Sequence, residues 1–153
     1  MTNKHPRHQK GATLIEVLIA VVVLSIGLLG LAGLQVTSVQ SNHSAYQRSQ
    51  ATLLAYDLAD RMRANRTQAL TNDYLIDYPT SSSTNSVTGT QAAKDIAEWL
   101  NNLALKLPEG TGKVEKDGSM VIIHVRWNDN RGRIAKSDAA ASDPEVFTYR
   151  TEI

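Results

Sequence analysis

One acidic residue inside a long apolar run is the side chain that most needs a chemical explanation. Glu16 is the single charge within residues 12–34, a run of 23 residues near the N-terminus. An unpaired carboxylate within a membrane span costs on the order of 3 kcal/mol. Two explanations stay open: Glu16 lies shallow enough to reach the interface, or it pairs with a cation of a neighbouring chain. A cut after Gly11 would supply that cation, because the new α-amino group of Ala12 would lie about one helical turn away.

The four histidines do not form a recognisable metal site. His5 and His8 have the spacing of a metal-binding pair on a helix, but both lie in the short basic segment before the apolar run. His43 and His124 are far apart in the sequence, and no cysteine or paired acid stands at ligand spacing. We expect His124 to be an ordinary strand residue on the less apolar face of a sheet. The sequence therefore predicts no metal and no cofactor.

Two further acidic patterns have simple structural explanations. Asp57 and Asp60 could mimic a catalytic carboxylate pair, but the arginines beside them, Arg61 and Arg63, favour surface ion pairs. Residues 128–132 resemble a calcium-binding loop but lack its closing glutamate, so we expect a solvated turn. The sequence contains no phosphate-binding loop and no dinucleotide-binding fingerprint. We therefore predict that the protein is not an enzyme.

The apolar run has the length of a membrane anchor. Its 23 residues would span roughly 34 Å as a helix, enough to cross the core of a bilayer. The apolar part of a cleavable secretory signal is shorter, at about 7–15 residues. With 153 residues in total, the chain has room for this anchor and one small domain. The absence of cysteine excludes a disulfide framework and a thiolate metal site.

The charge distribution predicts how the anchor is oriented. Three basic residues, Lys4, Arg7 and Lys10, precede the apolar run without any acid, and residues 35–47 after it carry no Asp, Glu, Lys or Arg. This asymmetry places the N-terminus in the cytoplasm and the rest of the chain on the far side of the membrane. Beyond those three, 16 − 3 = 13 basic residues face 15 acidic ones, about −2 in net charge. So weak a field does not suggest nucleic-acid binding.

Helical periodicity continues beyond the apolar run. Apolar residues follow at i, i+3, i+4, i+7 and i+11, which is one stripe of an amphipathic helix: Ala51, Leu54, Ala55, Leu58 and Met62. We expect one helix over residues 12–66, about 80 Å long. Three glycines recur within its apolar part at every third residue, Gly27, Gly30 and Gly33. They fit either small-residue packing between membrane helices or a stretch that loses helix inside a filament.

The sequence pattern of the remaining residues predicts a small α+β domain, the head. Residues 71–90 are rich in Ser, Thr and Asn and read as a loop, within which residues 74–78 pack on the helix or form a short strand. A second amphipathic helix carries Ile96, Trp99, Leu100, Leu103 and Leu107 and ends at Pro108 and Gly110. A β-meander is expected to follow, with a hairpin turn at residues 117–118 and a strand over residues 121–127, where apolar residues alternate. A polar loop over residues 128–143 then leads to a last strand around Val146, Phe147 and Tyr149.

The N-terminal motif resembles that of a known family. Residues 10–16, Lys-Gly-Ala-Thr-Leu-Ile-Glu, and the apolar residues after them resemble the class III signal of type IV prepilins and type II secretion pseudopilins. Residues 25–35 and 48–65 resemble the minor pilins of type IV pili, in particular the PilV group. The resemblance covers roughly the first 66 residues well. The family usually has Phe at the position of Ala12.

The resemblance implies a processing site and a role for each residue of the motif. A prepilin peptidase would recognise Lys10, Thr13 and Leu14, cut after Gly11, and methylate the new N-terminus at Ala12. Glu16 would set the register between subunits. The implied fold is that of a pilin, with a long helix packed on a small antiparallel sheet. The implied regions are a leader (1–11), a transmembrane and assembly segment (12–34), an amphipathic helical spine (35–66) and a head (67–153).

Three functional hypotheses follow from these patterns. The first is a minor pilin near the pilus tip, which primes assembly with the major pilin, other minor pilins and the inner-membrane assembly platform, and helps to display an adhesin. The second is a minor pseudopilin of type II secretion. The third is an uncleaved single-pass protein whose head binds a periplasmic ligand. The first two predict an inner-membrane precursor with a periplasmic head.

Overall fold

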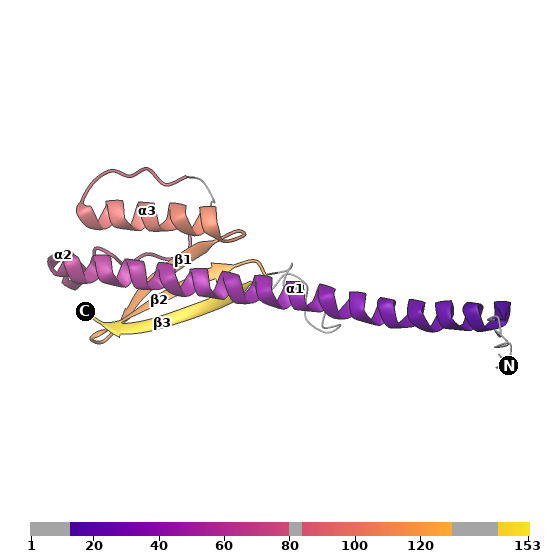
Figure 1. The fold of residues 1–153 in the computed structure, drawn as a ribbon. Helices are drawn as coiled ribbons and strands as arrows, with labels where there is room; N and C mark the ends of the chain where they lie inside the picture. Colours follow the sequence, from indigo (N-terminus) through magenta and orange to yellow (C-terminus); the bar gives the residue numbers. More distant parts are fainter. Residues whose placement is uncertain (1–12, 80–83, 130–143) are drawn as a thin grey trace, which may run out of the picture. The chain divides into compact units, whose positions relative to one another are not determined.

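The computed structural model describes residues 13–79, 84–129 and 144–153. Its elements follow in the order α1 (Leu14–Ala64), α2 (Arg66–Leu70), α3 (Gln91–Lys106), β1 (Thr111–Asp117), β2 (Met120–Trp127) and β3 (Glu145–Glu152) (Figure 1). The chain divides into two compact units, an N-terminal unit of residues 1–39 and a C-terminal unit of residues 40–153. The predicted α+β class is confirmed: a long helix accompanies a three-stranded antiparallel sheet.

In the N-terminal unit, α1 is apolar and exposed on every side. Each described residue from 13 to 39 is exposed to solvent, including every large apolar side chain of this stretch. By length and composition alone, α1 is able to cross a membrane, with a mean hydropathy of 2.8 in its most apolar window. Thr13 begins the helix, since its hydroxyl accepts a hydrogen bond from the Glu16 amide at 3.4 Å.

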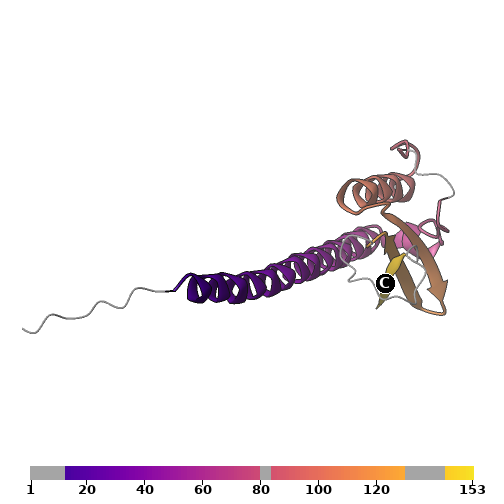
Figure 2. The same cartoon turned by 90° about the vertical axis from the view of Figure 1, so that its right-hand side faces the viewer.

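In the C-terminal unit, the predicted stripe of α1 forms part of the core. Ala51, Leu54, Ala55, Leu58 and Met62 are all buried, as the periodicity predicts. The helix α3 supplies the second layer through its own predicted residues, which are buried as well: Ile96, Trp99, Leu100, Leu103 and Leu107. Trp99 joins the two helices, because its indole N–H donates to the Leu54 carbonyl at 2.9 Å. Figure 2 shows the C-terminal half of α1 with α3 and the sheet on different sides.

The helix expected over residues 12–66 is interrupted earlier than the sequence predicts. α1 ends at Ala64, and the five-residue helix α2 begins at Arg66. Asn65 lies between them with φ −116° and ψ 52°, and its side-chain amide donates to Gln68 at 2.7 Å and to Tyr74 at 3.1 Å. These bonds to residues further along the chain stabilise the break, although no Gly or Pro marks it.

The sheet is the predicted meander. β2 lies in the centre and pairs antiparallel with β1 and with β3. The hairpin turn predicted at residues 117–118 joins β1 to β2, and Gly118 there has φ +61°, a conformation that glycine adopts without strain. The strand alternation is confirmed from Ile123 onwards: Val121, Ile123, Val125 and Trp127 are buried, while His124 and Arg126 are only half-buried. Ile122 departs from it, because it belongs to the face of His124 and Arg126 and is nevertheless buried.

The loop expected over residues 71–90 contributes to the core at its first end. Tyr74 is fully buried, and Ile76 forms a single bridge with Val114 of β1, through backbone hydrogen bonds of 3.1 and 2.8 Å. Of the two arrangements open for this segment, the structure therefore combines packing with one isolated β-bridge. The bridge pairs with the outer edge of β1 at Val114.

Candidate functional site

The processing motif lies partly outside the described residues. The structure describes neither Lys10, Gly11 and Ala12 nor the two histidines before them, His5 and His8. Thr13 and Leu14 start α1, and the Leu14 side chain is 92% exposed. Glu16 lies in the first turn of α1, where a carboxylate interacts favourably with the positive end of the helix dipole.

Among the described residues, no cation pairs with Glu16. The exposed apolar side chains around it also have no packing partner within the described chain. No ion pair of the described chain involves Glu16. Residues 14–39 bury no side chain within the molecule. Water is a poor environment for so wide an apolar surface, so this segment requires either lipid or other helices around it.

The three glycines of α1 are not required by packing within the chain. A methyl group added at Gly27, Gly30 or Gly33 would meet no other atom within 4 Å. Both interpretations, close packing between helices of different chains and local loss of helix, remain predictions.

The acidic residues of the second half of α1 form the ion pairs expected of them. Arg61 binds Asp57 at 3.1 Å, and Arg63 binds Asp60 at 2.7 Å. Arg61 also reaches α3, where it lies 2.7 Å from Glu98. Its hydrogen bond to Glu98 is the largest effect that raises the pKa of Arg61. Each of these carboxylates is therefore paired with an arginine, as expected for structural ion pairs and unlike a catalytic acid–base pair.

A buried polar network that the sequence does not announce lies behind these pairs. Asp95 of α3 is 5% exposed and accepts hydrogen bonds from Tyr74 at 2.5 Å, Gln91 at 2.9 Å and Arg61 at 3.5 Å. Buried carboxylates are stable when they are paired and hydrogen-bonded in this way. The network ties α1, α3 and the segment after α2 together, so we assign it a role in the fold.

Tyr74 gives this network a testable pH dependence. Burial, followed by the hydrogen bond to Asp95, raises the pKa of Tyr74 from 10.0 to about 12. The folded chain thus holds the phenol proton more tightly than the unfolded chain, so this stabilisation is complete below pH 10 and is lost as the pH rises through 12.

We therefore expect the free energy of unfolding of the full chain in detergent to fall between pH 10 and 12. In Tyr74→Phe this fall should be smaller by on the order of 2 kcal/mol. Urea unfolding, followed by the fluorescence of the buried Trp99 and Trp127, measures it. Tyr56→Phe, at a ring that is 45% exposed, is the matched control. Identical pH profiles for wild type and Tyr74→Phe would contradict this account.

His124 behaves as an ordinary residue of the outer sheet face, as predicted. Its two ring nitrogens lie 2.9 Å from Glu115 and 3.1 Å from Thr148. Glu115 also pairs with Lys113 at 2.9 Å, and this hydrogen bond is the largest of the effects that lower the pKa of Glu115. Among the described residues, no group of three or more His, Cys, Asp or Glu side chains is arranged to hold a metal ion.

The expectation of a solvated turn at residues 128–132 is wrong for the part that the structure describes. Asp129 is only 3% exposed and accepts a hydrogen bond from the Ser44 hydroxyl at 2.6 Å. Its other carboxylate oxygen, the Gln47 side-chain oxygen and the Trp127 indole nitrogen are buried without a partner. This contact between α1 and the end of β2 buries Asp129, and sequence spacing contains no signal for it. Residues 130–132 lie outside the described chain.

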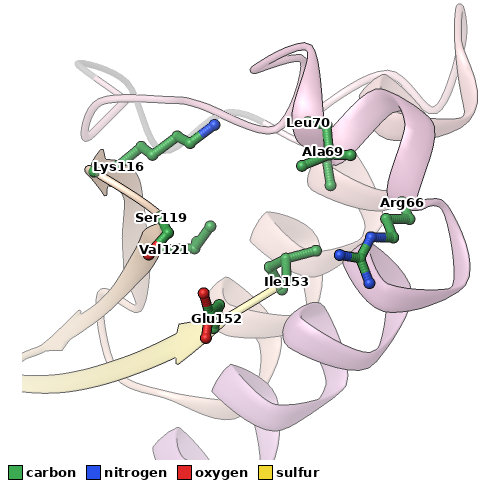
Figure 3. A pocket seen from close by; sticks show the side chains of 9 residues that line it. Arg66, Ala69, Leu70, Lys116, Ser119, Val121, Glu152 and Ile153 are labelled. Atoms are coloured by element: carbon green, nitrogen blue, oxygen red, sulfur yellow. The ribbon is translucent and has the colours of Figure 1, made fainter.

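One hollow of about 280 Å³ lies between α2, the β1–β2 turn and the end of β3 (Figure 3). Arg66 and Lys116 supply positive charge to its walls, Glu152 supplies negative charge, and Val121 and Ile153 are apolar. Lys116 is already bonded to Asn72 at 3.3 Å. Ser119 adds a hydroxyl to the lining, but no hydrogen bond of the described chain joins it to a basic side chain, so an activated nucleophile is not formed there.

Sequence reasoning missed a set of exposed apolar residues on the C-terminal half of α1. Tyr46, Leu53 and Tyr56 are 59%, 60% and 45% exposed, although charged residues were expected on that face. The spacing of seven between Tyr46 and Leu53, which places both on one side of a helix, was the available signal. Their exposure leaves apolar surface on this side of the helix that another molecule could cover.

Comparison with known proteins agrees with this organisation of an apolar helical segment followed by a small α+β unit. The family model described as type IV pilin Tt1218 matches residues 33–99, and the model of the prokaryotic N-terminal methylation motif matches residues 6–32. Over residues 33–99 the chain is therefore similar to type IV pilins, and residues 6–32 match the prepilin methylation motif. Pilins are structural subunits and not an enzyme family. Searches of curated proteins and of solved structures found no match.

The methylation motif carries further consequences for the chain. It implies processing by a prepilin peptidase and assembly with other pilins. Together with the apolar α1, it indicates membrane anchoring and location in a pilus. The motif match includes Gly11, Ala12 and Glu16, but the roles of these individual residues stay predictions.

Proposed function

We propose that the chain is a minor pilin of the type IV pilus, similar to the PilV group, which primes filament assembly and lies near the tip. The observation that carries this proposal is the first half of α1, which is apolar, exposed on every side and charged only at Glu16. Such a surface is suited first to lipid and then to other helices, which is what a subunit that moves from membrane to filament needs.

In this proposal the motif residues act in sequence. The basic leader keeps the N-terminus of the precursor in the cytoplasm and the C-terminal unit in the periplasm. The peptidase recognises Lys10, Thr13 and Leu14 and cuts after Gly11. The α-amino group of Ala12, with or without a methyl group, is then available to Glu16 of a neighbouring subunit. That ion pair fixes the axial step between subunits while the rest of the apolar surface packs.

A minor pseudopilin of type II secretion is the second candidate, since it would use the same anchor and the same motif. Deletion of the gene distinguishes the two functions. For a minor pilin we expect few or no surface pili by electron microscopy, with secretion of type II substrates unchanged. The tagged wild-type chain should restore piliation and be found by immunoblot in sheared pili. Normal piliation with lost secretion would assign the chain to the secretion system instead.

A further inference from the structure

The outermost strand of the sheet has one open edge. β3 pairs with β2 along all its residues, from Glu145 opposite Trp127 to Glu152 opposite Met120. Within the part of the chain that the structure describes, no strand or bridge pairs with its other edge. The opposite edge of the sheet differs, because Ile76 bridges to Val114 there. Figure 1 shows β3 as the strand at the border of the sheet.

The sequence of β3 lacks most of the features that protect an open edge. Proteins block such edges with proline, charged side chains (above all lysine) or a bulge, since exposed backbone groups recruit other strands. β3 reads Glu-Val-Phe-Thr-Tyr-Arg-Thr-Glu, without Pro or Lys, and its register with β2 contains no bulge. Two of its three charged residues, Glu145 and Glu152, lie at the ends of the strand, which leaves Arg150 as the charge within it. Its β-branched and aromatic residues favour strand pairing. Val146, on the outer face, is 48% exposed.

One of the exposed apolar residues of α1, Tyr56, contacts β3. The Tyr56 ring packs edge-on against Tyr149 of β3, with ring centroids 4.8 Å apart. Leu53, three residues before Tyr56, is its neighbour on the helix surface. α3 contacts α1 elsewhere, through the Leu54 carbonyl and Arg61. A strand added beyond β3 would therefore continue the sheet under Tyr56 and cover apolar surface that is now exposed.

The directions of α1 and β3 argue against pairing of this edge with the β3 edge of a second copy of the chain. Successive contacts join residues 48, 56 and 63 of α1 to residues 145, 149 and 151 of β3, so the two elements run the same way. Pairing of two β3 edges about an axis perpendicular to the sheet would reverse α1 in one copy, whereas subunits of one filament share a direction. Pairing of two β3 edges about an axis along the strand would turn the sheet of the second copy over. Its more polar face, with Thr148, Arg150 and Glu152, would then lie under Tyr56 of the first copy.

We propose that the open edge of β3 accepts an extended segment of a different subunit of the pilus, which adds a strand to the sheet. Main-chain hydrogen bonds hold such a segment, and side chains at alternate positions select it. Apolar side chains would face Tyr56 and Tyr149, and an acidic one would face Arg150, which is exposed and forms no ion pair with a described residue. This inference rests on the proposed function in a pilus.

Two neighbouring proline substitutions test the edge. Successive residues of a strand point their N–H groups to opposite edges, so one of Thr148→Pro and Tyr149→Pro breaks a bond to β2 and the other loses an N–H at the open edge. Tyr149→Pro also loses the ring that packs on Tyr56, so its reference is Tyr149→Ala, whereas the reference for Thr148→Pro is wild type. Urea unfolding of each full-length chain in detergent identifies the proline variant that keeps the stability of its reference. We expect that variant to enter sheared pili about tenfold less than its reference, because it cannot pair with the incoming strand. Equal amounts would overturn the inference.

A second measurement identifies the occupant and serves if both proline variants unfold. Benzoylphenylalanine is placed at Thr148, with Lys116 on the opposite edge as the control position, and intact piliated cells are irradiated. We expect a cross-link from position 148 alone, mapped by mass spectrometry to a segment of another pilus subunit with alternating apolar residues. A cross-link to a second copy, a link within the same chain, or none at all would overturn it. Absence of the wild-type chain from pili would instead refute the proposed function.

Discussion

Replacement of Glu16 by alanine is expected to leave insertion into the membrane intact and to lower incorporation into pili by about tenfold or more. Insertion should not suffer, because the change removes the single charge of an apolar span, whose cost is on the order of 3 kcal/mol. Incorporation should suffer, because Glu16 has no cation among the described residues of its own chain and is assigned to the N-terminus of a neighbour. Immunoblots of membranes and of sheared pili measure the two quantities separately.

Two further variants separate charge from shape at this position. Glu16→Gln keeps the size of the side chain without the charge, and we expect it to behave as Glu16→Ala does. Glu16→Asp keeps the charge on a shorter side chain, and we expect partial incorporation. If Glu16→Ala and Glu16→Gln enter pili in wild-type amounts, the register role is wrong, and the alternative that Glu16 simply reaches the membrane interface is preferred.

A large loss of stability is expected from Gly112→Ala in β1. A methyl group at Gly112 would lie 2.2 Å from the Trp99 ring and 2.9 Å from Leu103. Trp99 is fully buried and held by its bond to the Leu54 carbonyl, so it has no free space to move into. We expect Gly112→Ala to lower the free energy of unfolding by about 3 kcal/mol, the upper range for overpacking a core.

Urea unfolding of the full chain in detergent, followed by Trp127 fluorescence, measures this loss. Lys113→Ala, at the next and half-exposed residue of β1, is the matched control and should cost less than about 1 kcal/mol. In a Trp99→Phe background the smaller ring should reduce the cost of Gly112→Ala, since two residues in contact are coupled. Equal costs in both backgrounds would show that the clash with Trp99 is not the cause.

Local patterns predicted most of the fold. The stripes of α1 and α3 and the alternation of β2 depend on the period of one element, so the sequence alone contains the information. Gly118 likewise fixes the hairpin turn through its own backbone conformation. The break at Asn65 was not predicted, because the bonds that stabilise it reach Gln68 and Tyr74 and depend on how the chain folds back.

The candidate sites were predictable to a smaller extent. The ion pairs of Asp57 and Asp60 lie within one or two turns of a helix and follow from spacing. Asp129 is buried against Ser44, 85 positions away in the sequence, and Asp95 is buried against Tyr74, 21 positions away. No spacing rule detects contacts between residues so far apart. The open edge of β3 becomes visible only when the strand order is known.

The most direct test of the central claim is intact-mass and N-terminal peptide mass spectrometry of the chain from membranes and sheared pili. The account predicts a mature chain that begins at Ala12, with or without one methyl group on its α-amino nitrogen, in both preparations. A chain that still carries residues 1–11 in cells with an active prepilin peptidase would contradict the account and favour an uncleaved single-pass membrane protein.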